Sequence, residues 1–159
     1  MSIIGIADRV EAYHIEEYIQ ANTLFDVIHR QMSPGKFHAR ADFIQVNGII
    51  LYRERWSHLT LVQGATPAGY FMFGGISKPG RKVDWCGGEL SRERLAYAPS
   101  STEVDFTIPG GGDHCVVLVP RDLLLQHLDE AATEILLAHR YHIEGNRGYM
   151  LIGLIQPPH

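Results

Sequence analysis

The sequence lacks the features of several protein classes. Its 14 Lys and Arg against 18 Asp and Glu give a net charge of -4, so it has no basic excess of the kind that nucleic-acid-binding surfaces show. No apolar run approaches the roughly 20 residues of a membrane-spanning helix, and no signal peptide is apparent at the N-terminus. The only cysteines, Cys86 and Cys115, are expected to be free thiols. We therefore expect a cytoplasmic protein without direct nucleic-acid binding or membrane association.

Sequence motifs for metal and nucleophilic chemistry are also missing. His38, His58 and His114 are far apart in the chain, without the close ligand spacing of ordinary metal sites. No Gly-x-Ser-x-Gly elbow occurs, and residues 110–112 (Gly-Gly-Gly) are not followed by the Lys-Ser/Thr of a phosphate-binding loop. A three-histidine site assembled from separate strands is the remaining alternative. We expect no metal and no cofactor.

The residues that are abundant predict an antiparallel β-protein. Sixteen glycines and eight prolines lie mostly between short apolar runs. Residues 37–46 alternate between apolar and polar side chains, and Asn47-Gly48 is a strong signal for a type I′ hairpin. In the returning strand, residues 49–57, Tyr52, Glu54 and Trp56 share one face with Ile50, and Arg53 and Arg55 share the other. Further strands are predicted at residues 59–63, 70–76, 82–86, 89–97, 103–108 and 113–119.

Helical periodicity is predicted at both ends of the chain. Residues 8–20 are expected to form a helix with Asp8 as its cap. Pro120 suits a first helical position, and a stripe of apolar residues predicts a second helix that ends at Gly145-Asn146: Leu124, Leu128, Ala131, Ile135 and Ala138. The apolar run 149–155 is expected to be a buried strand or a docking segment. This helix or the run could form a homodimer face, with packing on the protein's own β-structure as the alternative.

A series of turn and strand motifs extends from Gln31 to Pro120. In order, they are Gln31-x-x-Pro34-Gly35-x-Phe37, Leu51-Tyr52-Arg53-Glu54-Arg55, Pro67-x-Gly69-x-x-x-Phe73-Gly74, Trp85-x-Gly87, Pro99-x-x-x-Glu103-x-Asp105, Pro109-x-Gly111 and Val119-Pro120. In these motifs the segment resembles the effector-binding domain of AraC-type transcription regulators. The resemblance implies a mainly β fold with flanking helices (α+β), built as a cupin-like antiparallel β-barrel that accepts a small ligand. It also implies that residues 24–32, ambiguous by periodicity, form the first strand.

One ligand-binding domain over residues 1–159 is the expected organisation. It would comprise an N-terminal helical segment (1–23), the barrel (24–119), a helix (120–145) and an apolar C-terminal segment (146–159). Regulators of this type continue into a helix-turn-helix half, which does not follow here. The sequence therefore predicts either the sensor half of a regulator or a free-standing barrel with another use.

Aromatic residues on the predicted strands are the candidate walls of a pocket for a small hydrophobic or aromatic metabolite. The predicted ligand-binding residues are Tyr52, Trp56, Phe71, Phe73, Trp85, Tyr97 and His38. The alternative is that these rings only fill a narrow barrel. If the chain is instead a metal-independent enzyme of the isomerase or cyclase type, Glu54 and His58 are the expected catalytic residues, because such a reaction needs a group that moves a proton.

Overall fold

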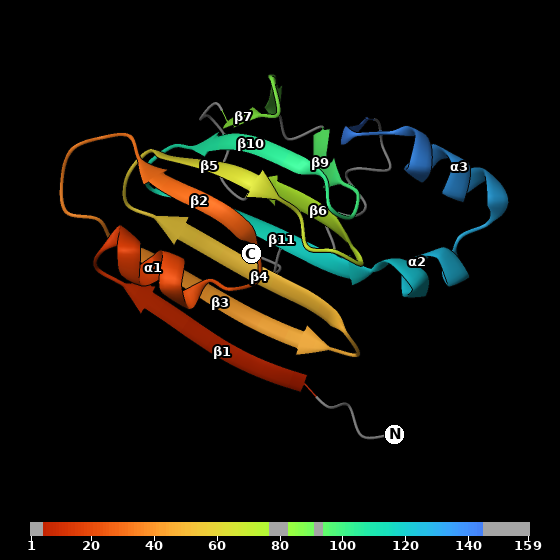
Figure 1. Ribbon diagram of the computed structural model, residues 1–159, viewed down its shortest axis with the longest axis horizontal. Coiled ribbons are helices and arrows are strands. Elements are labelled where there is room, and N and C mark those ends of the chain that lie inside the picture. Colours follow the sequence, from red (N-terminus) through yellow and green to blue (C-terminus); the bar gives the residue numbers. More distant parts are fainter. Residues whose placement is uncertain (1–4, 77–82, 91–93, 145–159) are drawn as a thin grey trace, which may run out of the picture.

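The computed structural model describes residues 5–76, 83–90 and 94–144. The elements in Figure 1 follow the chain in this order: β1 (Gly5–Ala12), α1 (Ile15–Ala21), β2 (Asp26–Gln31), β3 (Ala39–Val46), β4 (Ile49–Trp56), β5 (Thr60–Ala65), β6 (Tyr70–Ile76), β7 (Val83–Trp85), β8 (Gly88–Leu90), β9 (Arg94–Ala98), β10 (Glu103–Ile108), β11 (Gly112–Pro120), α2 (Arg121–His127), α3 (Glu130–Ala138) and β12 (Tyr141–Glu144).

Two antiparallel sheets form the body of the protein. The seven-stranded sheet has the order β1-β3-β4-β11-β6-β9-β12, and the five-stranded sheet has the order β2-β5-β10-β7-β8. The main hydrophobic core contains side chains from both sheets, among them Trp56 and Met72 from the first and Val62 and Val104 from the second. The expected mainly β fold with flanking helices is confirmed. Within the described residues the strands make two open sheets, and no closed barrel is present.

The β3–β4 hairpin is the element that the sequence predicts best. Its turn residues Asn47 and Gly48 have φ angles of 51° and 83°, which a type I′ turn requires. On β4 the side chains of Tyr52, Glu54 and Trp56 are buried, while the alternate arginines are exposed. The strand faces inferred from alternation are therefore confirmed.

The N-terminal segment differs from the prediction. The expected helix over residues 8–20 is wrong in its first half, where β1 pairs with β3 from Gly5↔Val46 to Ala12↔Ala39. Only Ile15–Ala21 is helical, and His14, not Asp8, is the N-cap residue. The physical reason is that the free edge of β3 offers an eight-residue ladder of backbone hydrogen bonds, which helical spacing in one short segment cannot reveal.

The C-terminal helix is also divided. In place of one helix over residues 120–145, α2 ends at His127 and α3 starts after Asp129, whose carboxylate accepts a hydrogen bond from the backbone N–H of Ala132 (2.7 Å). The break changes which face of the second helix is buried. Leu136 is 6% exposed, whereas Ile135 of the predicted apolar stripe is 44% exposed. The predicted strand 89–97 similarly becomes β8 and β9. Gly145-Asn146 and the apolar run 149–155 lie outside the described residues.

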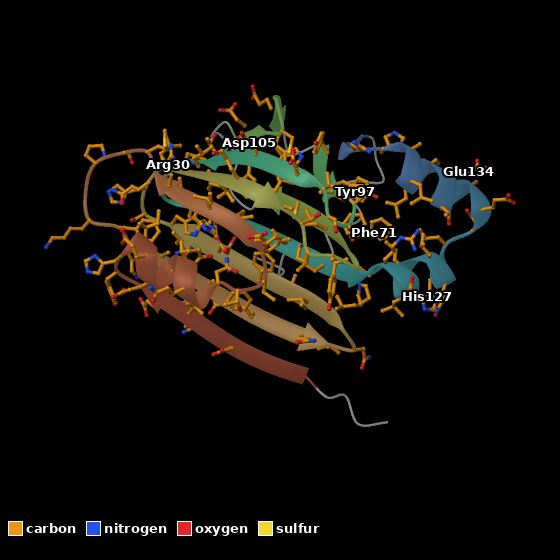
Figure 2. All side chains as sticks on the ribbon, viewed as in Figure 1. Arg30, Phe71, Tyr97, Asp105, His127 and Glu134 are labelled. Atoms are coloured by element: carbon orange, nitrogen blue, oxygen red, sulfur yellow. The ribbon has the colours of Figure 1, made fainter. Side chains whose placement is uncertain are left out.

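The outer face of the seven-stranded sheet has an apolar region and a charged region. The apolar region is a cluster on β6 and β9, composed of Phe71, Phe73, Leu95 and Tyr97. Helices α2 and α3 cover it with four leucines: Leu124, Leu125, Leu128 and Leu136. The labelled Phe71 and Tyr97 lie near the two C-terminal helices in Figure 2. The Tyr97 hydroxyl donates a hydrogen bond to the carbonyl oxygen of Leu136 (3.0 Å). This cluster fixes the helices on the sheet.

Charged side chains occupy the same outer face across β3, β4 and β11. Asp113, 1% exposed, accepts hydrogen bonds from Arg53 Nε (2.8 Å) and Arg55 Nη2 (2.8 Å). Burial alone would raise the pKa of Asp113, but the two guanidinium groups outweigh it and lower the pKa to about 2. The carboxylate therefore stays ionised at neutral pH and links β4 to β11.

None of the helices in the described part of the chain is long and apolar enough to cross a membrane.

Candidate ligand-binding cavity

A cavity of about 50 Å³ lies between the two sheets. At about 10–15 Å³ for each water molecule, it has room for a few waters or one small group. Its walls are mostly apolar and come from both sheets; they include Met72, Gly74, Trp85, Val104 and Val116. One part of the wall is polar and contains Asn22, His29, Glu54, Trp56 and His114.

Glu54 is the hydrogen-bonding centre of this polar wall. The residue is 4% exposed and lies directly opposite His114 in the register of β4 and β11. His114 Nε2 is 2.7 Å from Glu54 Oε2. The Tyr18 hydroxyl and Asn22 Nδ2 (3.3 Å) both donate to Glu54 Oε1. Each carboxylate oxygen thus has protein partners, as a buried carboxylate needs.

Aromatic rings surround Trp56 at this wall. Its ring centroid lies 4.8 Å from that of His114, 5.5 Å from that of His29 and 6.0 Å from that of Tyr18, all in edge-to-face geometry. Edge-to-face packing fixes ring orientation as well as burying area. The polar wall is therefore formed by β4 and β11 of the seven-stranded sheet, by β2 of the five-stranded sheet and by α1.

Four buried polar atoms of this wall have no hydrogen-bond partner in the described part of the protein. They are Asn22 Oδ1, His29 Nδ1, Trp56 Nε1 and His114 Nδ1. All four residues line the cavity and are at least nine-tenths buried. Most buried polar atoms in folded proteins have partners, because leaving one unpaired costs about 1–3 kcal/mol. Because four such atoms belong to residues that line one cavity, we take this cavity as the candidate ligand site.

Burial also controls the protonation of His29. Removal from water, and secondarily the neighbouring His114, lower the pKa of His29 to about 4. The ring is therefore neutral at pH 7, with one nitrogen that donates and one that accepts. Burial likewise raises the pKa of Tyr52 well above its usual value, so its hydroxyl stays protonated.

The structure places four of the residues singled out in the sequence at the cavity and the others elsewhere. Tyr52, Glu54, Trp56 and Trp85 line the cavity. Phe71, Phe73 and Tyr97 belong to the cluster beneath the helices, because Met72 and Gly74 are the residues of β6 that point inward. Those three predicted rings therefore do not line this cavity.

The two other histidines of the prediction lie away from Glu54. His38 is half-exposed, with Nε2 2.9 Å from Glu11 Oε1, and His58 Nδ1 lies 2.6 Å from Ser57 Oγ. Neither lines the cavity. The pairing of Glu54 with His58 that the enzyme hypothesis needs is therefore not formed, and the histidine beside Glu54 is His114.

Sequence reasoning missed Tyr18, Asn22, His29 and His114 as members of the site. Alternation along the strand from residue 113 to 119 could have put His114 on the same face as Val116. Its partnership with Glu54 also needs the β4–β11 pairing, which no local pattern gives. Among the described residues, no group of three or more His, Cys, Asp or Glu is placed to hold a metal ion.

Comparison with known proteins gives a likeness of fold. No protein-family model and no curated protein matches the sequence. Among solved structures, the crystal structure of the AraC-like transcriptional activator CuxR matches with a TM-score of 0.67 and 11% sequence identity, over 93% of this chain. The chain spans 59% of the length of that activator. At the level of fold, this chain is thus similar to an AraC-like regulator over more than half of the regulator's length.

Proposed function

We propose that this chain is the small-molecule-sensing domain of an AraC-type regulator and that the cavity between its sheets holds the effector. The observation that carries the proposal is the cavity itself, with apolar walls and four unpartnered polar atoms in one part of its lining. Ligand sites are typically apolar hollows with a few convergent polar groups. The fold likeness to an AraC-like transcriptional activator supports a sensing role.

The apolar walls favour a small hydrophobic metabolite as effector. Both cysteines in the chain are free thiols, which favours a reducing compartment and so a cytoplasmic location. The alternative of a metal-independent isomerase or cyclase is not favoured, because its expected catalytic pair is not brought together.

A cavity-filling variant tests the proposal. A Cβ added at Gly74 would lie 3.6 Å from Ala96 Cβ and 3.7 Å from Val116 Cγ2, which are ordinary contacts. The remainder of a leucine side chain would project into the cavity, so Gly74→Leu should block it. Val117→Leu, half-buried on the other face of the same sheet, is the matched control.

The measurement is native mass spectrometry after incubation with a metabolite extract of the source cells. We expect a small molecule to stay bound to the wild-type protein and to Val117→Leu but not to Gly74→Leu. Circular dichroism establishes that all three proteins are folded, and Gly74→Ala provides a milder filling. Equal retention by folded Gly74→Leu would refute the cavity as the effector site.

A further inference from the structure

We propose that the effector is an uncharged molecule with a small apolar body and a group that both donates and accepts hydrogen bonds, such as an aliphatic hydroxyl. This inference rests on the proposed function, since it names the chemistry of the molecule held in the same cavity.

Two of the unpartnered atoms have fixed hydrogen-bonding roles. Trp56 Nε1 carries a hydrogen and can only donate. Asn22 Oδ1 can only accept, and the orientation of this amide is set by its other end: Nδ2 donates to Glu54 Oε1, whereas the flipped amide would bring two oxygens together. A ligand that satisfies both atoms must therefore supply an acceptor and a donor.

The two histidines can adapt to such a ligand. His114 Nε2 faces the Glu54 carboxylate and carries the hydrogen of that bond, so in the neutral ring Nδ1 is an acceptor. His29 Nδ1 has no protein partner that would fix its tautomer. The polar wall thus offers a donor at Trp56, acceptors at Asn22 and His114, and an atom at His29 that can take either role. A hydroxyl is the smallest group that can use both kinds.

The charges at the wall disfavour ionised ligands. No Lys or Arg within the described residues lines the cavity, so an anion would lie beside the Glu54 carboxylate without compensation. A cationic ligand would gain little binding energy from Glu54, because both carboxylate oxygens already bond protein groups: Tyr18, Asn22 and His114. Transfer of an unpaired charge into this largely apolar space is costly. The space of about 50 Å³ further restricts the body of the ligand to a few carbon atoms, because an apolar cavity that holds benzene measures about 150 Å³.

Four probes with four non-hydrogen atoms each test this chemistry: 2-propanol, acetone, 2-chloropropane and acetate. The hydroxyl of 2-propanol donates and accepts, acetone only accepts, 2-chloropropane does neither, and acetate is an anion. Affinities are measured at pH 7 by isothermal titration calorimetry with the wild-type protein, Gly74→Leu and His29→Phe. We expect 2-propanol to bind about tenfold tighter than 2-chloropropane, since the pairing of buried polar atoms is worth about that factor. The affinity of acetone should be intermediate, and acetate should bind at least tenfold more weakly than 2-propanol.

The variants separate failure of the ligand chemistry from failure of the site. His29→Phe keeps an aromatic ring but removes the polar atom, so it should reduce the preference for 2-propanol over 2-chloropropane several-fold. Equal affinities of 2-propanol and 2-chloropropane for the wild type, with both lost in Gly74→Leu, would overturn the inferred chemistry and leave the cavity site standing. Tighter binding of acetate than of 2-propanol would overturn the inferred chemistry as well. No binding by any probe, or undiminished binding to Gly74→Leu, would overturn both the chemistry and the proposed site.

Discussion

The titration of His29 gives a quantitative prediction for stability. In the folded protein its pKa is about 4, whereas the ordinary value is 6.5. As the pH falls from 8 to 5, the unfolded chain takes up a proton on this histidine and the folded protein does not. Proton uptake that favours the unfolded state lowers the free energy of unfolding, here by about 2 kcal/mol at pH 5 from the two pKa values.

The comparison that isolates this contribution is between the wild type and His29→Phe. Phenylalanine can keep the ring contacts with Trp56 and Tyr18 and has no titrating group. Every other titrating residue is common to both proteins, so their contributions largely cancel in the difference. The wild type should lose about 2 kcal/mol more than His29→Phe between pH 8 and pH 5.

Urea denaturation followed by circular dichroism at the two pH values measures this difference. A matched control is His127→Gln, which removes an exposed histidine at the end of α2 (Figure 2) and should follow the wild-type profile. Parallel pH profiles of the wild type and His29→Phe would refute the reasoning, because they would mean that the folded protein protonates His29 as readily as the unfolded chain does.

Three further predictions concern the outer face of the seven-stranded sheet. Asp113→Asn, which removes the carboxylate shared by Arg53 and Arg55, should cost about 1–2 kcal/mol in urea denaturation at pH 7, allowing for the solvent around the arginines. That cost should shrink as the pH falls from about 4 to about 2, because protonation of Asp113 removes the same ion pairs from the wild type. Tyr97→Phe should cost about 1 kcal/mol at pH 7 through the lost hydrogen bond, and a cost near zero would count against it. Leu136→Ala should cost about 2–4 kcal/mol and lower the melting temperature; an unchanged melting temperature would mean that α3 contributes little to the core.

Local signals in the sequence were sufficient where neighbouring residues determine the structure. Asn47 and Gly48 fix the hairpin because both occupy positive φ, and the tight turn then fixes the register of β3 and β4. The strict alternation in residues 50–56 correctly grouped Tyr52, Glu54 and Trp56 on one face, and the structure shows that this face is the buried one. These features depend on contacts within about twenty residues of chain.

Long-range pairing decided the regions where the predictions were wrong. Residues 8–12 carry a pattern compatible with a helix, and only their ladder with β3 makes them a strand. On β6 the sequence Tyr-Phe-Met-Phe-Gly is apolar on both faces, since one face lines the cavity and the other lies beneath α2 and α3. Period-2 alternation cannot choose between two buried faces. For that reason Phe71 and Phe73 were assigned to the cavity in place of Met72 and Gly74.

In the candidate site, too, local sequence signals identify some residues and only long-range contacts identify the others. Glu54 and Trp56 were found from one strand, but their partners Tyr18, His29 and His114 come from α1, β2 and β11. Three separate elements converge there through the pairing of the sheets and the packing of α1. No spacing along the chain records that convergence, so the polar wall becomes visible only in three dimensions.

Because α1 is attached to the polar wall, hydrogen exchange in this helix should report on the state of the wall. It has seven residues and no side-chain cap, and so short a helix is not stable alone in water. The bonds of Tyr18 and Asn22 to Glu54 connect it to the interior. Amide hydrogen exchange in Ile15–Ala21 should therefore follow the state of Glu54: a Glu54→Ala variant should exchange faster there, and an effector that orders the wall should slow the same amides. Helix α1 can in this way register occupancy of a cavity that none of its own seven residues lines.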